Sequence, residues 1–306
     1  MFRKKILAFT FTATSFFSLS QDFLSSQTAA DNVGLNPSLA GNNNIGRLAF
    51  NYRNQWPKLT GNYVTYNGNF YQYLPKLNGY GGIRFMNDVQ ARTFYTNSTS
   101  LFYGQNINIG NVLFRPSLEI GYTQMKVDDD QIIYNNDSSQ ISEIHSKSNY
   151  LDLNIGTLFS YKNLTLGFSA HHLNAPTVNL SFMNPYTLSP KYGAQFSYQF
   201  NLENAKLNIS PFVIYQSQNA FQQFRYGINL LYKKHYNFAF SSTNWDMLIF
   251  NFGYQNQFFA VNYSYDFTVS KLNNGISGGA HELSLIFKFW KRNPTKKLLE
   301  VNSVFQ

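Results

Sequence analysis

The side chains that could bind a metal or catalyse a reaction are few, and their spacing suits neither task. His171 and His172 are adjacent, and neighbouring residues of a strand point to opposite faces, so the pair cannot chelate one ion from one strand. Residues 128–130 are three aspartates, but they lack the D-x-D-x-D-G spacing and the distal glutamate of a calcium loop. We therefore expect a hydrogen-bonded histidine at a strand end, a solvated external turn and no metal site.

Other stretches that resemble functional motifs also have a structural explanation. The glycine-rich pieces 78–82 and 275–279 precede predicted strands rather than helices, so they are not phosphate loops and suit turns and close strand packing. No nucleophile stands at a recognised spacing from a base. A basic tail contains Lys291, Arg292, Lys296 and Lys297. It could bind nucleic acid or anionic lipid, but in an exported chain we expect a solvated periplasmic tail. The sequence predicts no enzyme, no cofactor and no nucleic-acid partner.

Composition restricts the elements that can carry these side chains. The 306 residues include 18% aromatic and only 13% charged side chains, with a net charge of +9, and the mean hydropathy is −0.30. Soluble domains are about 25% charged, and disordered chains are poor in aromatics. A helical membrane protein would have a higher mean hydropathy. The absence of cysteine excludes a disulfide scaffold. A β-rich protein is what remains.

The N-terminus predicts export. A cationic start at 3–5 precedes an apolar run at 6–19, and the small-x-small site at 18–20 leaves Gln21 as the mature terminus. The alternative is a membrane anchor, but the run is short and rich in hydroxyl groups for a span of about 30 Å. No later stretch approaches 18 apolar residues, so any membrane span of the mature chain must be a barrel. We therefore expect an outer-membrane location.

Alternation with a period of two runs through the rest of the chain. Between 257 and 269, apolar Phe259, Val261, Tyr263, Tyr265 and Phe267 alternate with polar residues, which predicts a strand with one apolar and one polar face. Such segments are 45–55, 61–73, 79–87, 92–103, 112–125, 149–161, 164–172, 190–200, 206–216, 221–232, 236–244, 247–255, 257–268 and 280–290. Their length of roughly 9–13 residues suits tilted membrane strands. A soluble sandwich or propeller would also alternate, but its strands would be shorter, and no blade-like repeat is present.

The connections between these strands support the same fold. If the N-terminus is periplasmic, the three longest connections, 126–148, 173–189 and 269–279, all lie outside, as in outer-membrane barrels. We predict an all-β transmembrane, antiparallel up-and-down barrel of about 14 strands. The predicted organisation is a signal peptide at 1–20, a periplasmic segment at 21–44, the barrel at 45–290 and the periplasmic tail at 291–306.

Barrel closure also predicts a cluster of charges. The first and last strands must pair, and Arg53 and Glu282 both lie on polar faces near the outer ends of those strands. Asp266 lies at a similar height on the preceding strand. We expect these three side chains to meet in the lumen across the seam. The alternative is three separately hydrated lumenal charges.

Several stretches are similar to one known family. They are 35–41 (LNPSLAG), 51–57 (NYRNQWP), 85–88 (FMND), 172–176 (HLNAP) and 263–287 (YSYDFTVSKLNNGISGGAHELSLIF). In order and spacing they resemble the PorP/SprF family of type IX secretion in Bacteroidetes, across nearly all of the mature chain. The resemblance implies an outer-membrane barrel that works with gliding-motility and secretion components. It also implies a dedicated partner, a large surface protein whose C-terminal sorting domain the barrel helps to export and anchor. It transfers no catalytic motif.

We therefore expect a secretion and anchoring barrel that binds and does not turn over a substrate. The expected partners are the sorting domain, secretion components and outer-membrane lipid. The candidate partner-facing loop is 173–189, which carries Asn174, Pro176, Phe182, Pro185 and Tyr186. The alternative is a diffusion channel for small solutes, although no charged ring that would select a solute is evident.

Overall fold

The computed structural model describes residues 23, 25–41, 46–128, 147–180, 184–269, 274–289 and 304–305. Within these ranges, no helix is both long and apolar enough to cross a membrane. The predicted signal peptide and its cleavage site lie outside the described residues. So do Phe182, the triplet's Asp129 and Asp130, and the four basic residues of the tail.

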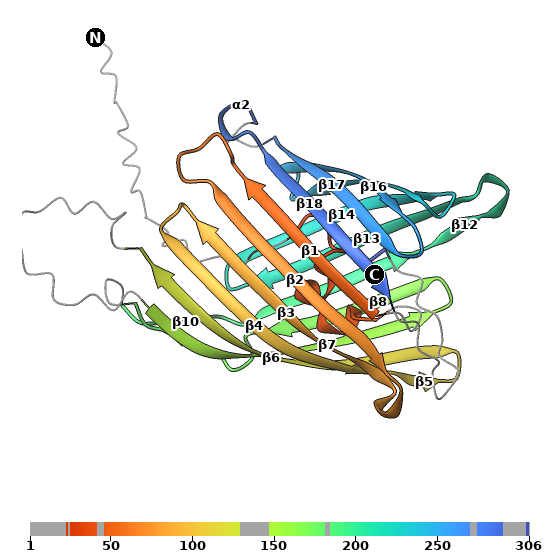
Figure 1. The fold of residues 1–306 in the computed structure, drawn as a ribbon, viewed down its shortest axis with the longest axis horizontal. Coiled ribbons are helices and arrows are strands. Elements are labelled where there is room, and N and C mark those ends of the chain that lie inside the picture. The colour runs from red at the N-terminus through yellow and green to blue at the C-terminus, as the bar shows by residue number, and fades with distance from the viewer. Residues whose placement is uncertain are drawn as a thin grey trace, which may run out of the picture.

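The described residues form a closed barrel of fourteen long antiparallel strands (Figure 1). These strands are β1 (Gly46–Gln55), β2 (Tyr63–Leu74), β3 (Gly79–Gln90), β4 (Phe94–Gln105), β6 (Val112–Val127), β7 (Lys147–Tyr161), β8 (Leu164–His171), β11 (Lys191–Tyr198), β13 (Leu207–Gln218), β14 (Phe221–Tyr232), β15 (Tyr236–Thr243), β16 (Met247–Gln255), β17 (Phe259–Thr268) and β18 (Ala280–Phe289). Pairing of β1 with β18 closes the ring, and β11 pairs with both β8 and β13. The predicted fold class and strand number are confirmed.

Short elements complete the described architecture. β5 (Ile107–Ile109) pairs with β6, and β12 (Phe200–Leu202) pairs with β13. β9 (Thr177–Val178) and β10 (Tyr186–Thr187) form a separate two-stranded sheet in the connection after β8. The helices are α1 (Asn32–Leu35), α2 (Asn274–Ser277) and the 3₁₀ turns η1 (Pro37–Leu39), η2 (Pro75–Leu77) and η4 (Glu203–Ala205).

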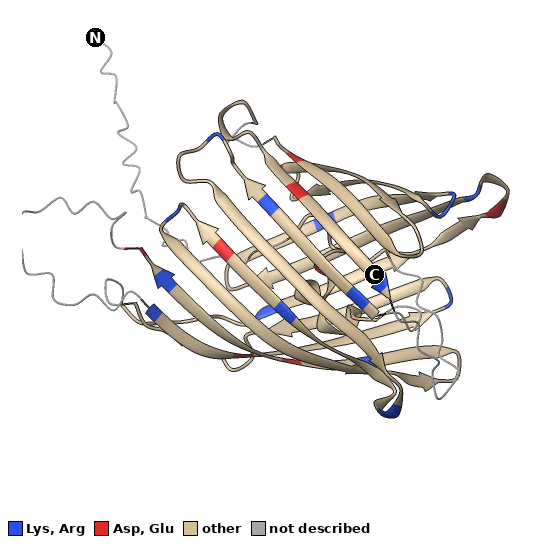
Figure 2. Cartoon of the chain, in the orientation of Figure 1, with Lys and Arg blue, Asp and Glu red and all other residues tan. Residues whose placement is uncertain are grey.

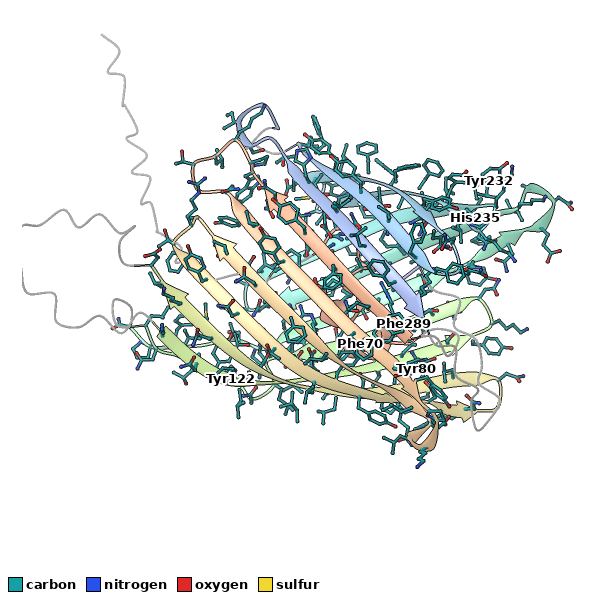
Figure 3. The ribbon with its side chains drawn as sticks, in the orientation of Figure 1. Phe70, Tyr80, Tyr122, Tyr232, His235 and Phe289 are labelled. Atoms are coloured by element: carbon teal, nitrogen blue, oxygen red, sulfur yellow. The ribbon has the colours of Figure 1, made fainter. Side chains whose placement is uncertain are left out.

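The barrel wall is apolar outside and polar inside. On β18, Leu283 and Phe287 are 45% and 44% exposed, whereas Glu282 beside Leu283 is 1% exposed. Aromatic side chains pair across strands on the outer face, and the rings of Phe70 and Phe289 stack 5.9 Å apart (Figure 3). An exposed apolar band around a polar interior is stable only in contact with lipid, which explains why the chain has so many aromatics and so few charges.

Residues 25–41, hereafter the lumenal segment, lie inside the barrel. Figure 1 shows their helices α1 and η1 between the barrel walls, and Asn32, Asn36, Ser38 and Leu39 have no exposed surface. This differs from the prediction that 21–44 form a periplasmic segment. The reason is physical: the polar wall offers hydrogen-bond partners at close range to a segment that is mostly polar and has a single charged residue, Asp31.

The chain's other end also returns to this interior. Phe305 is fully buried against Phe212 with Leu35 and Leu39 of the lumenal segment, and Val304 packs against the same cluster. The sequence predicted a periplasmic tail over 291–306. For the two described residues of that tail, the structure shows contact with the lumenal segment instead.

Candidate functional site: the lumenal segment and its anchors

The structure brings together the three charges predicted at the barrel seam. The β1–β18 register pairs Arg53 directly with Glu282. Arg53 Nη1 lies 2.9 Å from Glu282 Oε2, and Arg53 Nη2 lies 2.7 Å from Asp266 Oδ2. Figure 2 shows the charged bands of β1, β17 and β18 side by side. All three side chains are almost fully buried, so each charge depends on its neighbours rather than on water.

The lumenal segment completes the coordination of these charges. Ser26 Oγ donates to Asp266 Oδ2 at 2.6 Å and accepts from Arg53 Nη1 at 2.7 Å. The backbone N–H groups of Ser26 and Gln27 donate to the Glu282 carboxylate at 2.8 and 3.1 Å, and the Ser25 hydroxyl also donates to it. The seam ion pairs therefore form a binding site for backbone and hydroxyl groups, in addition to closing the barrel.

Gln27 extends this first anchor along β18. Its Nε2 donates to the Glu282 carbonyl at 2.8 Å, and its Oε1 accepts from Ser284 Oγ at 2.6 Å. From β14, four strands along the wall from β18, Arg225 Nη1 donates to the Ser25 carbonyl at 2.9 Å. The start of the segment is thus gripped from β14 as well as from the seam.

A second anchor lies on β1 to β3. Asp31 caps α1 by accepting from the Gly34 N–H at 3.2 Å, and the same oxygen lies 3.2 Å from Arg84 Nε. Asn69 Nδ2 donates to the Ala30 carbonyl at 2.9 Å, and Arg47 donates to the Ala29 carbonyl. Short helices end in unpaired backbone groups, and here the wall supplies many of the partners that a free peptide would take from water.

Asn36 forms the third anchor. Its Oδ1 accepts from the Ser38 N–H at 2.9 Å, and its Nδ2 donates to Gln195 Oε1 at 2.9 Å and to the Phe168 carbonyl at 3.1 Å. The wall is lined by glycine where this side chain lies. A Cβ at Gly156 would lie only 2.1 Å from Asn36 Oδ1, so the wall makes room for the amide.

Arg115 forms the fourth anchor, at the other end of the segment. Its Nη1 donates to the carbonyls of Ala40, Gly41 and Ser38 at 2.6, 3.1 and 3.2 Å. The guanidinium also lies 5.0 Å from the centroid of the Tyr80 ring, within cation–π range. One buried cation thus holds three carbonyls of the last turn, the arrangement expected at the C-terminal end of a short helix.

The two ends of the segment lie near opposite rims. Arg53 and Asp266 are third from the outer ends of β1 and β17, whereas Arg115 is near the start of β6 at the periplasmic end in the predicted orientation. Apolar contacts fill the space between anchors, because Leu35 and Leu39 pack with Leu113 and Leu158. The segment therefore crosses the lumen and is held along its length.

The histidine pair lies where the sequence placed it, at the end of β8. His172 Nδ1 is 2.8 Å from Asp152 Oδ1, and the backbone N–H of His172 donates to Asn154 Oδ1 at 2.9 Å. His171 Nε2 is 3.4 Å from the Leu35 carbonyl of the lumenal segment. Among the residues that the structure describes, no three potential metal ligands cluster. The geometry of the described lumen thus suits binding of a polypeptide segment.

The four candidate loop residues that the structure describes do not form one surface. Asn174 bonds to β7, with Oδ1 accepting from the Leu153 N–H at 3.0 Å and Nδ2 donating to the Leu151 carbonyl at 2.7 Å. Tyr186 packs inward against Val178 and Leu180. The Pro176 carbonyl accepts from the Leu188 N–H, and Pro185 is exposed. The described part of the connection is thus tied to β7 through Asn174.

Sequence reasoning missed Asn36, Arg115 and the Ser25–Gln27 contacts. The available signal was the 35–41 motif itself. It combines buried-type Leu and Ala with turn-forming Asn, Pro, Ser and Gly, which is unusual for a solvated linker. In the structure that motif contains the third anchor and the carbonyls bound by the fourth.

Comparison with known families agrees with this geometry. Residues 18–287 match the family described as type IX secretion system membrane protein PorP/SprF. The chain belongs to the PorP/SprF family. The match includes the lumenal segment and the seam, so both belong to the part of the chain that defines this PorP/SprF protein. No curated protein matches the sequence.

Solved structures share the barrel fold at low sequence identity. The toluene transporter TbuX of Ralstonia pickettii has a TM-score of 0.50 at 9% identity, covering 86% of this chain and 94% of TbuX. Omp33 of Acinetobacter baumannii has a TM-score of 0.46 at 10% identity, covering 81% and 99%. Outer membrane phospholipase A of Escherichia coli has 0.35 at 10% identity, covering 87% and 99%. The likeness to TbuX supports a barrel fold for the PorP/SprF protein and says nothing about its substrate.

Proposed function

We propose that this outer-membrane barrel supports secretion and surface anchoring of one partner surface protein by binding its C-terminal sorting domain. The observation that carries the proposal is the lumenal segment, which is anchored from the seam to Arg115. A lumen that holds its own chain so firmly has little use as a solute path. Family membership supports the role in type IX secretion.

The mechanism is binding rather than turnover. The rigid barrel holds its outer connections at a fixed height in the membrane, and an exported domain docks on them through aromatic and hydrogen-bonding contacts. On the opposite rim, Lys162, Lys233 and Lys234 occupy tight turns with positive φ, where secretion components in the periplasm can reach them. The signal peptide at 1–20 delivers the chain to this location.

The experiment is a surface-shaving proteome of wild-type cells and a deletion strain. We expect the deletion to remove one particular surface protein and to leave the other secreted proteins at normal levels. A barrel with 173–189 replaced by a short polar linker should assemble and display less of that protein. Collapse of the whole secreted set would instead identify a core secretion component, and an unchanged surface would contradict the proposal.

The second candidate function is a diffusion channel, favoured by the likeness of the fold to TbuX, which is described as a toluene transporter. Planar-bilayer conductance separates the two functions. We expect the purified barrel to be closed, and a variant lacking 25–41 to conduct if it still assembles. A steady open conductance of the intact protein would favour the channel.

A further inference from the structure

The outer half of β7 presents a strand edge that no described strand covers. β7 pairs with β6 from Lys147 to its end, but β8 is much shorter and pairs only with the stretch that begins at Ile155. β6 and β7 thus rise above β8 at the rim that carries the long connections. An uncovered edge displays backbone N–H and C=O groups, which makes it a template for another strand.

Part of this edge is capped by the turn after β8. The Leu173 N–H donates to the Leu153 carbonyl at 2.9 Å, and the Asn174 amide bonds the Leu153 N–H and the Leu151 carbonyl. The Asn174 side-chain amide therefore forms the two hydrogen bonds that the backbone of a neighbouring strand would otherwise form at this point. These bonds also show that odd-numbered residues of β7 aim their backbone groups away from β6. Beyond the cap, the backbone of Asn149 and the Leu151 N–H point to the same open side.

The side chains around this edge show what kind of strand fits. Lys126 and Lys147 are directly paired and exposed on the outward face, above Tyr122 and so beyond the apolar belt. One step lower, Gln124 Nε2 donates to Asn149 Oδ1 at 3.0 Å. A second copy of this edge would bring lysine against lysine. An acidic extended segment would instead meet cations and amide groups.

We propose that the β7 edge from Lys147 to Leu151 binds an extended, acidic segment of the exported partner by strand addition. The inference rests on the proposed function and specifies its outer docking point. Main-chain hydrogen bonds would supply the affinity, and the two lysines and the amide pair would supply the selectivity. The connection after β8 touches this part of β7 through the Asn179 N–H, which donates to the buried Ser148 Oγ at 2.9 Å, and through Val178, which packs with Tyr150. The alternate residues Lys147 and Asn149 are exposed.

The test is photo-crosslinking in cells that express the full protein. A photoreactive residue replaces Asn149, and the matched control replaces Asn97, which is exposed at the same height on β4. We expect Asn149, and not Asn97, to crosslink to one extended stretch of an exported polypeptide. Crosslinks to 129–146 or 181–183 of the same chain would overturn the proposal, because the edge would then be self-covered. Crosslinks to lipid alone, or none, would overturn it too.

A backbone variant tests the hydrogen bonds themselves. Leu151→Pro removes an edge N–H that the β6 ladder does not use, whereas Leu151→Ala keeps it. We expect the Asn149 crosslink to fall roughly five- to tenfold with proline and to persist with alanine, the effect of losing about one hydrogen bond. Equal crosslinking in both would overturn strand addition. If display of the partner protein is lost in the deletion strain but normal in the proline variant, the proposed function stands and the proposal that the β7 edge is the docking site fails. If the deletion changes nothing at the surface, the proposed function itself fails.

Discussion

Arg53 and Glu282 occupy directly opposed positions on the two strands that close the barrel, with Nη1 and Oε2 2.9 Å apart. The same carboxylate also accepts the backbone N–H groups of Ser26 and Gln27. Closure of the barrel and retention of the lumenal segment are therefore coupled through one glutamate. A barrel that lost this ion pair would also lose the first anchor of the segment.

Charge reversal tests this coupling. Arg53→Glu leaves three carboxylates together in a buried site, and we expect it to lower the free energy of unfolding by roughly 3–5 kcal/mol. Adding Glu282→Arg should restore only part of that loss, because an arginine cannot accept the two backbone N–H groups. The measurement is urea unfolding in lipid vesicles as a double-mutant cycle. Simple additivity of the two substitutions would show that the residues do not interact.

A pair of glycines tests the packing of the lumenal segment. Gly41 has φ +98°, and a Cβ there would lie 2.3 Å from the Tyr80 ring. Gly110 has φ +59°, and a Cβ there would have no atom within 4 Å, so it controls for adding a Cβ at a positive φ where no clash follows. We expect Gly110→Ala to cost about 1 kcal/mol and Gly41→Ala clearly more. The measurement is the temperature at which the barrel loses its folded mobility in an SDS gel. An equal decrease of this temperature in both variants would mean that the Gly41 contact is not formed.

Cysteine labelling tests the direction of the segment. The chain contains no cysteine, so a single introduced thiol gives an unambiguous signal. Phe23 precedes the anchor at the outer rim, whereas Ser38 is fully buried. In intact cells we expect a membrane-impermeant maleimide to label Phe23→Cys and not Ser38→Cys. Labelling of Phe23→Cys only after the outer membrane is opened would place this end of the segment at the periplasmic side.

Two asparagines perform the same structural task at different places. Asn174 caps the β7 edge, and Asn244 caps the β14 edge by accepting from the Phe224 N–H at 2.8 Å and donating to the Gln222 carbonyl at 3.1 Å. Replacing either by alanine removes two hydrogen bonds, and we expect a similar loss of roughly 1–3 kcal/mol in unfolding experiments.

The two asparagine variants should differ in function. Only Asn174→Ala should also reduce display of the partner protein at the cell surface, because Asn174 positions the connection next to the proposed docking edge. Surface shaving of both strains gives the comparison. An equal reduction in both strains would attribute the effect to barrel stability alone.

The strands could be predicted because each records its surroundings in its own alternation. In β17, outward Tyr263 and Phe267 face lipid while inward Ser264 and Asp266 face the lumen, and the predicted 257–268 agrees with the observed Phe259–Thr268. Counting such strands placed Arg53 opposite Glu282, since closure leaves only one way to pair the first and last strands. The alternation with period two is therefore enough to predict both the barrel fold and the residues that meet where its first and last strands pair.

The position of the lumenal segment inside the barrel could be learned only from the tertiary structure. Residues 25–41 have no period, because their partners are scattered over most of the wall, from Arg225 on β14 to Arg115 on β6. Contacts of that kind satisfy individual polar atoms and leave no repeating pattern in the chain. The uncovered β7 edge likewise depends on how far β8 rises beside it. Local alternation determined which residues face lipid, and only the closed barrel decided what its polar interior would bind.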